Sequence, residues 1–433
     1  MGYAEGHATW YRLDTSAKIY PAIESPEDTT IFRLSVTLED EIDPQILAQA
    51  LAQAKVRFPY YNVHLKCGVF WNYLERSENE SVVWPDTRWP CERLYARYNN
   101  GYLYKVKYHK RRIAVEFSHV LTDGSGGLEF LKTLVQRYLV LTGKVSEGRV
   151  AGVLDVNDIP APEESEDAFL RVLEIEKNVV GRKERTLFGD ERVFRVRGRR
   201  LPLGKHLVIT GNVPVEDLKA VAAEYTVTIT ELLAGLYLEA LLLAQAEQVR
   251  NTDRHQKIAV EVPVNMRRFY PIQCMRNFSL FVIPTLDPRY IHSLDEIMSA
   301  VREFIKNCAT REGLLPMVRD NTSLGENWLL KHVPLFVKNS AIRYVSRTQG
   351  ATQFSGTVSN MGNVRLPDEL VEHVESMDFI LGPSVEGKTT CAVLGYQGRV
   401  VISFGRVVKD ARIARHVFRR LVEMGASVEV TSN

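Results

Sequence analysis

The feature that most constrains the fold is a strand, a short turn and a helix that follow one another between residues 112 and 138. The first residues of this stretch alternate around a run of apolar side chains, which is typical of a strand. The turn reads His119-Val-Leu-Thr-Asp123-Gly124, and a helical pattern begins near Gly127. A strand joined so directly to an amphipathic helix indicates an α/β protein.

His119 is the strongest candidate for a catalytic residue. An imidazole titrates near neutral pH and can therefore accept a proton without special tuning. His119 stands at a strand-to-loop junction and is followed by Asp123 and Gly124, an arrangement that none of the other nine histidines has. The alternative is a hydrogen-bonded histidine of the core, which is the usual state of a histidine at a strand end.

The length of 433 residues predicts two domains, because one hydrophobic core rarely serves so long a chain. An acidic, proline-containing stretch at residues 160–167 carries no strand pattern. We therefore expect an N-terminal half over residues 1–175, with the histidine motif, and a C-terminal half over residues 176–433. The second half repeats the alternation of strand and helix patterns without evident sequence identity. Its signals include a capping box at Thr228 and Glu231 and an alternating hairpin over residues 389–404, and in the first half Asp43 is a predicted N-cap before Pro44.

Composition excludes several classes of protein. A net charge of +2 gives no reason to expect nucleic acid as the partner. The five cysteines are scattered without CxxC spacing, so we expect neither a metal site nor disulfides. The N-terminus lacks the pattern of a signal peptide. The apolar run at residues 232–246 is interrupted by Glu239 and too short to span a membrane, so we prefer a buried core helix there. We therefore expect a cytoplasmic protein without a transmembrane segment.

The HxxxDG motif at His119, Asp123 and Gly124 resembles the active-site motif of the CoA-dependent acyltransferases with the chloramphenicol acetyltransferase fold. The segment from Trp10 to Pro21 is similar to the N-terminal signature of bacterial alcohol acetyltransferase-like proteins. The resemblance implies two mixed-sheet α/β sandwich halves with an active-site tunnel between them. It also implies that His119 deprotonates the acceptor directly, as general base, and that no acyl-enzyme forms.

The same resemblance suggests a structural role for Asp123 and Gly124. In the family the motif's aspartate points away from the imidazole and pairs with an arginine. The candidate here is Arg267, which follows a strand pattern and precedes the pair Arg276-Asn277. The alternative is that Arg267 is a solvated loop residue.

A second motif, Thr357-Val-Ser359-Asn360-Met-Gly, looks like the Ser-Asn-x-Gly turn of the alcohol acetyltransferases. Strand alternation points Thr357 and Ser359 to one face, from which a hydroxyl can stabilise an oxyanion. We favour Ser359 because it lies nearer the turn, with Thr357 and Asn360 as further candidates. The alternative is a polar strand end followed by a glycine turn.

The sequence departs from the motifs of two subgroups of this family, the plant BAHD acyltransferases and the condensation domains. The segment 378–382 only loosely echoes the DFGWG motif of the plant BAHD acyltransferases, and Ser118 stands where condensation domains usually carry a second histidine. A basic run from Arg195 to Arg200 is a candidate for binding the phosphates of CoA. The alternative for that run is a solvated surface, as for most charge runs.

The predicted function is transfer of an acetyl or other short acyl group from CoA to a small alcohol. Acetyl-CoA or another acyl-CoA enters as co-substrate, no cofactor stays bound, and we expect a monomer or weak homodimer. One alternative is a stand-alone condensation-type enzyme that uses a carrier-protein donor or an amine acceptor. Another is a non-catalytic binding module with the same fold.

Overall fold

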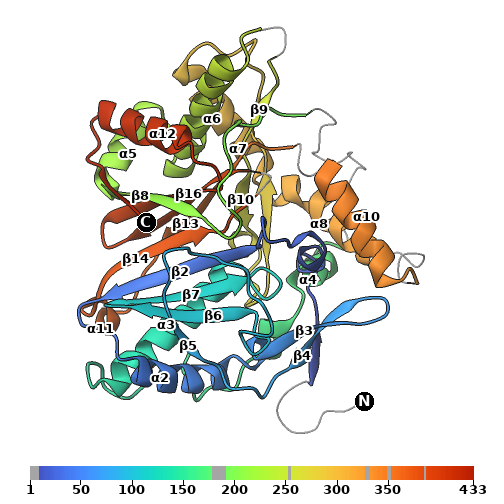
Figure 1. Ribbon diagram of the computed structural model, residues 1–433, viewed down its shortest axis with the longest axis vertical. Helices are drawn as coiled ribbons and strands as arrows, with labels where there is room; N and C mark the ends of the chain where they lie inside the picture. The colour runs from blue at the N-terminus through green and yellow to red at the C-terminus, as the bar shows by residue number, and fades with distance from the viewer. Residues whose placement is uncertain (1–8, 178–191, 252–254, 327–331, 349–352, 385–386) are drawn as a thin grey trace.

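The computed structural model describes residues 9–177, 192–251, 255–326, 332–348, 353–384 and 387–433. Two five-stranded sheets, one above the other in Figure 1, form the frame of the molecule. Helices cover the outer side of each sheet, and smaller two- and three-stranded sheets lie at their edges. This mixed α/β architecture confirms the predicted fold class.

The first sheet has the strand order β14-β2-β7-β6-β5. Its strands are β2 (Ile31–Leu38), β5 (Val83–Pro85), β6 (Tyr104–His109), β7 (Arg112–Ser118) and β14 (Val374–Leu381). All neighbours are antiparallel except β5 and β6. The strand that carries the histidine motif, β7, is therefore central and is held by a neighbour on each side.

The second sheet has the order β13-β15-β16-β8-β17. Its strands are β8 (Leu207–Pro214), β13 (Thr357–Asn363), β15 (Thr389–Tyr396), β16 (Arg399–Arg406) and β17 (Glu429–Ser432). Strand β13 pairs with β15 in parallel and lies at the edge of this sheet. The hairpin β15–β16 was expected from its alternating pattern, and every residue of β15 is buried.

Helices and short strands complete the described part of the chain. The helices are α1 (Tyr20–Ile23), α2 (Pro44–Arg57), α3 (Gly124–Leu141), α4 (Ala168–Ile175), α5 (Val215–Glu224), α6 (Ile229–Gln248), α7 (Leu294–Cys308), α8 (Arg311–Glu326), α10 (Leu335–Thr348), α11 (Asp368–Val371) and α12 (Arg412–Glu423). The short strands are β1 (Trp10–Arg12), β3 (Val63–Cys67), β4 (Asn72–Arg76), β9 (Ile258–Ala259), β10 (Val262–Asn265), β11 (Ser279–Val282) and β12 (Thr285–Leu286).

One strand crosses between the halves. β14 comes from the second half of the chain but pairs along β2 in the first sheet, with Phe379 opposite Leu34. The loose echo of the DFGWG motif lies in this strand, where Asp378 accepts a hydrogen bond from Ser35 (3.0 Å). Sheet membership thus does not follow the chain order, although the boundary near residue 175 stays a prediction.

Local signals placed several helices correctly. Helix α2 begins at Pro44, and the side chain of Asp43 accepts hydrogen bonds from the first turn as the predicted N-cap. Thr228 and Glu231 form the predicted capping box at the start of α6. These signals involve neighbours in sequence, so they operate independently of the rest of the fold.

Helix α6 is longer than its most apolar run suggested. It has 20 residues and is long and apolar enough to cross a membrane by length and composition, so the argument from shortness was wrong. However, 67% of its apolar window is buried inside the protein, against the second sheet and helices α7 and α12. The burial fits the alternative we preferred, a core helix.

The described residues form two hydrophobic cores. One packs α2 and α3 against the first sheet, and the other packs α5, α6, α7 and α12 against the second. Strand β15 places buried residues in both cores, and Met361 of β13 packs against the core of the first sheet while Val358 of β13 is buried in the other. Met361 also lies against Gly124, so the histidine motif contacts residues of the second half of the chain.

Candidate active site

The backbone of His119 is held from both halves of the chain. His119 follows the last residue of β7, and its N–H donates to the carbonyl of Thr30 (2.9 Å), just before β2. Its own carbonyl accepts from the side-chain amide of Asn277 (2.8 Å), in the second half. This double anchoring fixes the direction in which the imidazole leaves the strand.

Aromatic rings surround the imidazole. The ring of Tyr20 in α1 stacks on it with centroids 5.2 Å apart, and the ring of Phe32 lies tilted at 4.8 Å. The side chain of His119 is partly exposed, yet its Nδ1 is buried without a hydrogen-bond partner among the described residues. Burial lowers the pKa of His119 below its ordinary value of 6.5, and the charge of Asp123 opposes this shift only in part. The imidazole is therefore neutral at pH 7, as a base requires.

Both carboxylate oxygens of Asp123 accept hydrogen bonds from groups other than the His119 imidazole. Its Oδ1 accepts from the N–H groups of Ser125 and Gly126 (3.1 Å each), so Asp123 is the N-cap of α3. Its Oδ2 accepts from Arg267 Nη1 (2.7 Å), and also from the Phe278 N–H (2.8 Å). The aspartate–arginine pair expected from the sequence is present, and it keeps the pKa of Asp123 below 3.8 despite burial.

The sequence pattern placed the start of helix α3 too far along the chain. Helix α3 begins at Gly124 instead of near Gly127, because Asp123 caps it and does not act as a turn residue. A Cβ on Gly124 would lie 2.5 Å from the sulfur of Met361 in the second half. A Cβ on Gly126 would lie 2.4 Å from the carbonyl of Met275, also in the second half. The glycines thus allow the start of α3 to approach the second half closely.

The three polar candidates on β13 have different surroundings. The hydroxyl of Thr357 donates to Glu261 (2.8 Å), and the amide of Asn360 donates to Thr230 (2.9 Å) at the start of α6. The hydroxyl of Ser359 has no hydrogen-bond partner in the described part of the chain. Ser359 shares its strand face with Met361, which touches the position of Gly124. Of the three groups, Ser359 is the one left available to a ligand on the side of the histidine motif.

Sequence reasoning missed the residues that hold the motif in place. Asp14 is buried, and its Oδ2 accepts from the Asn277 amide (3.0 Å), the same amide that holds His119. Burial and the nearby Asp167 raise the pKa of Asp14 to about 7. Arg276 is also fully buried, and its Nη1 donates to the carbonyl of Leu121 (3.3 Å). The residue pair at 276–277 was visible in the sequence, but nothing there indicated that it anchors the loop after β7.

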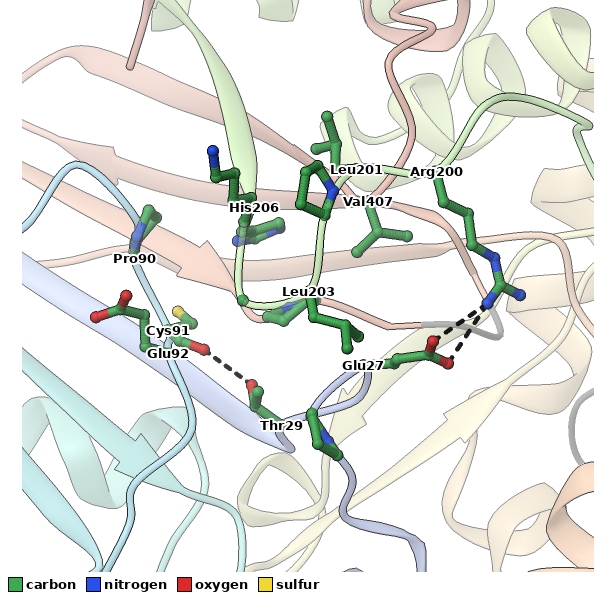
Figure 2. Close-up of a pocket in the computed structure, with 15 residues that line it drawn as sticks. Glu27, Thr29, Pro90, Cys91, Glu92, Arg200, Leu201, Leu203, His206 and Val407 are labelled. Atoms are coloured by element: carbon green, nitrogen blue, oxygen red, sulfur yellow. Dashed lines mark hydrogen bonds and ion pairs between the residues drawn. The ribbon is translucent and has the colours of Figure 1, made fainter.

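A small pocket opens where segments of both halves meet (Figure 2). Glu27 forms an ion pair with Arg200 across it (3.4 Å), and the hydroxyl of Thr29 donates to the carbonyl of Cys91 (2.9 Å). The cavity is about 40 Å³, far below the roughly 300 Å³ that a substrate site needs. The pocket is thus a packing defect between the halves and is not suited to an acyl donor.

Arg195 and Arg197, from the predicted basic run, line a separate and larger cleft of about 740 Å³. Five cationic side chains line it, and we call it the basic cleft; its lining residues are Arg192, Val193, Phe194, Arg195, Arg197, Gln248, Val249, Arg250, Asn251, Gln256 and Lys388. Arg200 lies outside this cleft, in the ion pair with Glu27. Across the described residues there is no cluster of side chains suited to hold a metal ion.

His206 in the small pocket leads to a prediction on stability. Its ring is buried, neither nitrogen has a partner among the described residues, and burial lowers its pKa to about 4. The unfolded chain takes up a proton near pH 6.5 and the folded chain does not, so stability should fall as the pH drops from 6.5 to 4, by up to roughly 3 kcal/mol. Denaturant unfolding of the wild type and His206→Leu at pH 7.5 and pH 5 checks this.

The comparison with His206→Leu is essential because Asp14 acts in the opposite direction. Its raised pKa makes its contribution to stability fall as the pH rises from 3.8 to about 7. The wild type should lose roughly 2 kcal/mol more than His206→Leu between pH 7.5 and pH 5. Equal losses in the two proteins would show that His206 is not the group that titrates.

Comparisons with known proteins bear on the fold. No protein-family model and no curated protein matches the chain. Among solved structures, trichothecene 15-O-acetyltransferase from Fusarium sporotrichioides aligns with a TM-score of 0.61 at 10% identity, over 98% of this chain and 99% of that chain. The polyketide synthase associated protein 5 from Mycobacterium tuberculosis aligns with a TM-score of 0.56 at 14% identity, over 96% and 98%. This protein has the chloramphenicol acetyltransferase-like fold.

That fold also occurs in a condensation domain that was solved with an acyl-CoA. The starter condensation domain of rhizomide synthetase, in a complex with C8-CoA, aligns with a TM-score of 0.58 at 14% identity, over 96% of this chain and 94% of that chain. Identities this low establish the fold alone. They confirm the coarse prediction of an acyltransferase-type fold and give no specific support to an alcohol acetyltransferase. The roles of individual residues remain predictions.

Proposed function

We propose that this protein transfers an acyl group from a CoA thioester to the hydroxyl group of a small alcohol. The observation that carries the proposal is the neutral His119 imidazole, which is anchored by both halves and not bonded to Asp123. His119 removes the hydroxyl proton while the alcohol oxygen attacks the thioester carbonyl. The C–S bond then breaks, and the imidazolium returns the proton to the leaving thiolate. No acyl-enzyme is formed.

In this proposal the other motif residues serve structural or electrostatic roles. Ser359 donates a hydrogen bond to the oxyanion of the tetrahedral intermediate, for which its free hydroxyl is suited. Asp123 and Arg267 hold the start of α3, and hence the loop after His119, against the second half. The acyl group is acetyl or another short chain, both substrates meet in a tunnel between the halves, and the location is cytoplasmic. Five free cysteines are compatible with a reducing compartment.

The direct test is release of free CoA. Purified protein is incubated with acetyl-, butyryl- and longer acyl-CoA and a panel of alcohols and amines, and a thiol reagent measures the product. Acceptor-dependent thiol release with alcohols supports the proposal. Release with amines alone would indicate the condensation-type alternative, which the likeness to a condensation domain keeps in consideration. No release with any acceptor or donor would indicate a binding module.

Ser359 provides a sharper test of the oxyanion role. Ser359→Ala should lower kcat by about 10² with little change in KM, since the hydrogen bond strengthens as negative charge develops. Thr357→Val is the matched control, because the Thr357 hydroxyl is already bound to Glu261. Steady-state kinetics of both variants decide the point. A large loss in Thr357→Val with none in Ser359→Ala would transfer the role to Thr357.

A further inference from the structure

The basic cleft has a composition that points to an anionic ligand. Its cationic lining residues are Arg192, Arg195, Arg197, Arg250 and Lys388, and no described acidic side chain lines it. Its volume of about 740 Å³ lies within the range of small-molecule sites, roughly 300–1,000 Å³. A concave surface with charges of one sign concentrates ligands of the opposite sign. The cleft is therefore large enough for an organic anion and has the charge to attract one.

The basic cleft is also built from fixed backbone. The side-chain amide of Gln248, at the end of α6, accepts from the Arg197 N–H (2.8 Å) and donates to the Arg197 carbonyl (3.0 Å). The ammonium of Lys388 donates to the carbonyl of Val196 (2.8 Å). These bonds hold the arginine-rich segment against α6 and the lysine against that segment, so the cations stay together.

The surroundings of Lys388 disfavour its positive charge. Burial and the charges of Arg195, Arg200 and Arg197 lower the pKa of Lys388. Lys388 also has a φ of 47°, a left-handed conformation that a side chain other than glycine adopts rarely. A strained, crowded cation is expected where a bound anion offsets the cost.

The cleft adjoins the strand that carries Ser359. A Cβ on Gly387, the neighbour of Lys388, would lie 3.2 Å from the Cα of Gly356, just before β13. The hydroxyl of Ser355 donates to the carbonyl of Phe194, a lining residue of the cleft. Ser359 lies three positions after Gly356, a distance of about 10 Å at roughly 3.3 Å per residue of strand. An extended part of a ligand that lies along β13 would connect the basic cleft with Ser359.

We propose that the basic cleft binds the phosphate groups at the nucleotide end of the acyl donor, which makes free CoA, rather than a carrier protein, the donor. This inference rests on the proposed function, because it places the thioester near Ser359. Arg197 and Lys388 bind the phosphates, and the uncharged pantetheine arm follows β13 toward His119. A carrier protein would present its arm without the 3′-phosphorylated nucleotide that the cations recognise.

The test separates phosphate binding from turnover. Calorimetry measures the affinity for adenosine 3′,5′-bisphosphate, and kinetics compare acetyl-CoA with acetyl-pantetheine, which lacks phosphates. Arg197→Gln combined with Lys388→Gln should weaken the bisphosphate and raise the KM for acetyl-CoA by about ten- to hundredfold, as expected for lost charged hydrogen bonds. The kinetics with acetyl-pantetheine should not change. Arg199→Gln is the matched control, because Arg199 is exposed in the same segment but does not line the cleft.

The possible outcomes distinguish a failure of the phosphate site from a failure of the proposed function. Equal bisphosphate affinity in the wild type and the double variant, or equal effects on both donors, would overturn the basic cleft as the phosphate site. If CoA still supported acyl transfer in that case, the proposed function would stand without it. Bisphosphate binding that depends on Arg197 and Lys388, without transfer to any acceptor, would support the site and contradict the proposed function. A KM for acetyl-CoA that rises with salt, while that for acetyl-pantetheine does not, would support the proposal.

Discussion

Replacing His119 with alanine should lower kcat by about 10²–10⁴, since that is what a positioned base usually contributes. The protein should remain folded. The substitution removes ring contacts with Tyr20 and Phe32, but it leaves no described polar group without the partner that Nδ1 would have provided, since Nδ1 has none. Steady-state kinetics and thermal unfolding measure the two effects. His109→Ala, at the exposed end of β6, is the matched control and should behave as the wild type.

The pH profile gives an independent view of the same residue. Only the neutral imidazole accepts a proton, so kcat/KM should fall as the pH drops through the pKa of His119. Burial lowers that pKa, so the acidic limb should lie below pH 6.5. A limb above pH 6.5, or unchanged turnover in His119→Ala, would remove His119 as the base.

Breaking the ion pair between Asp123 and Arg267 should destabilise the protein by about 3–5 kcal/mol from either side, because one buried charge is left without its partner. Asp123→Asn and Arg267→Ala are the single variants, and denaturant unfolding at pH 7 measures the free energy of unfolding. At that pH the carboxylate is fully ionised, since its pKa lies below 3.8. Activity should fall with stability, because the start of α3 loses its anchor.

The double variant should cost less than the sum of the single losses, as expected for coupled residues. Additive losses would show that the two side chains act independently. Glu216→Gln is the matched control, since Glu216 forms an exposed ion pair with Lys219. Exposed pairs contribute at most about 1 kcal/mol, so this variant should change the free energy of unfolding little.

Features governed by neighbours in sequence could be predicted. The Asp43 cap, the capping box at Thr228 and the hairpin β15–β16 follow from short-range patterns, and the structure confirms them. Helices α7, α8 and α10 were not predicted, although Ser293 and Glu296 form a capping box that signals the start of α7. That signal was present in the sequence and was overlooked.

The features of the candidate site also fall into those that a local motif predicts and those that depend on distant segments. The pairing of Asp123 with Arg267 followed from a motif, and the structure contains it. The roles of Asn277, Asp14 and Tyr20 could not be predicted, because each depends on segments far apart in sequence that meet only in the folded protein. No local pattern in the sequence indicates that one amide holds both Asp14 and His119.

The crossing of β14 makes the two halves inseparable. A fragment that ends near residue 175 would lack β14, so β2 would become an open edge with unpaired backbone groups along its length. Such an edge invites pairing with other chains, and the fragment would tend to aggregate. The remaining fragment would carry a strand without a sheet to join. We therefore expect that neither half folds properly without the other, and that a circular permutation must keep β14 able to reach β2.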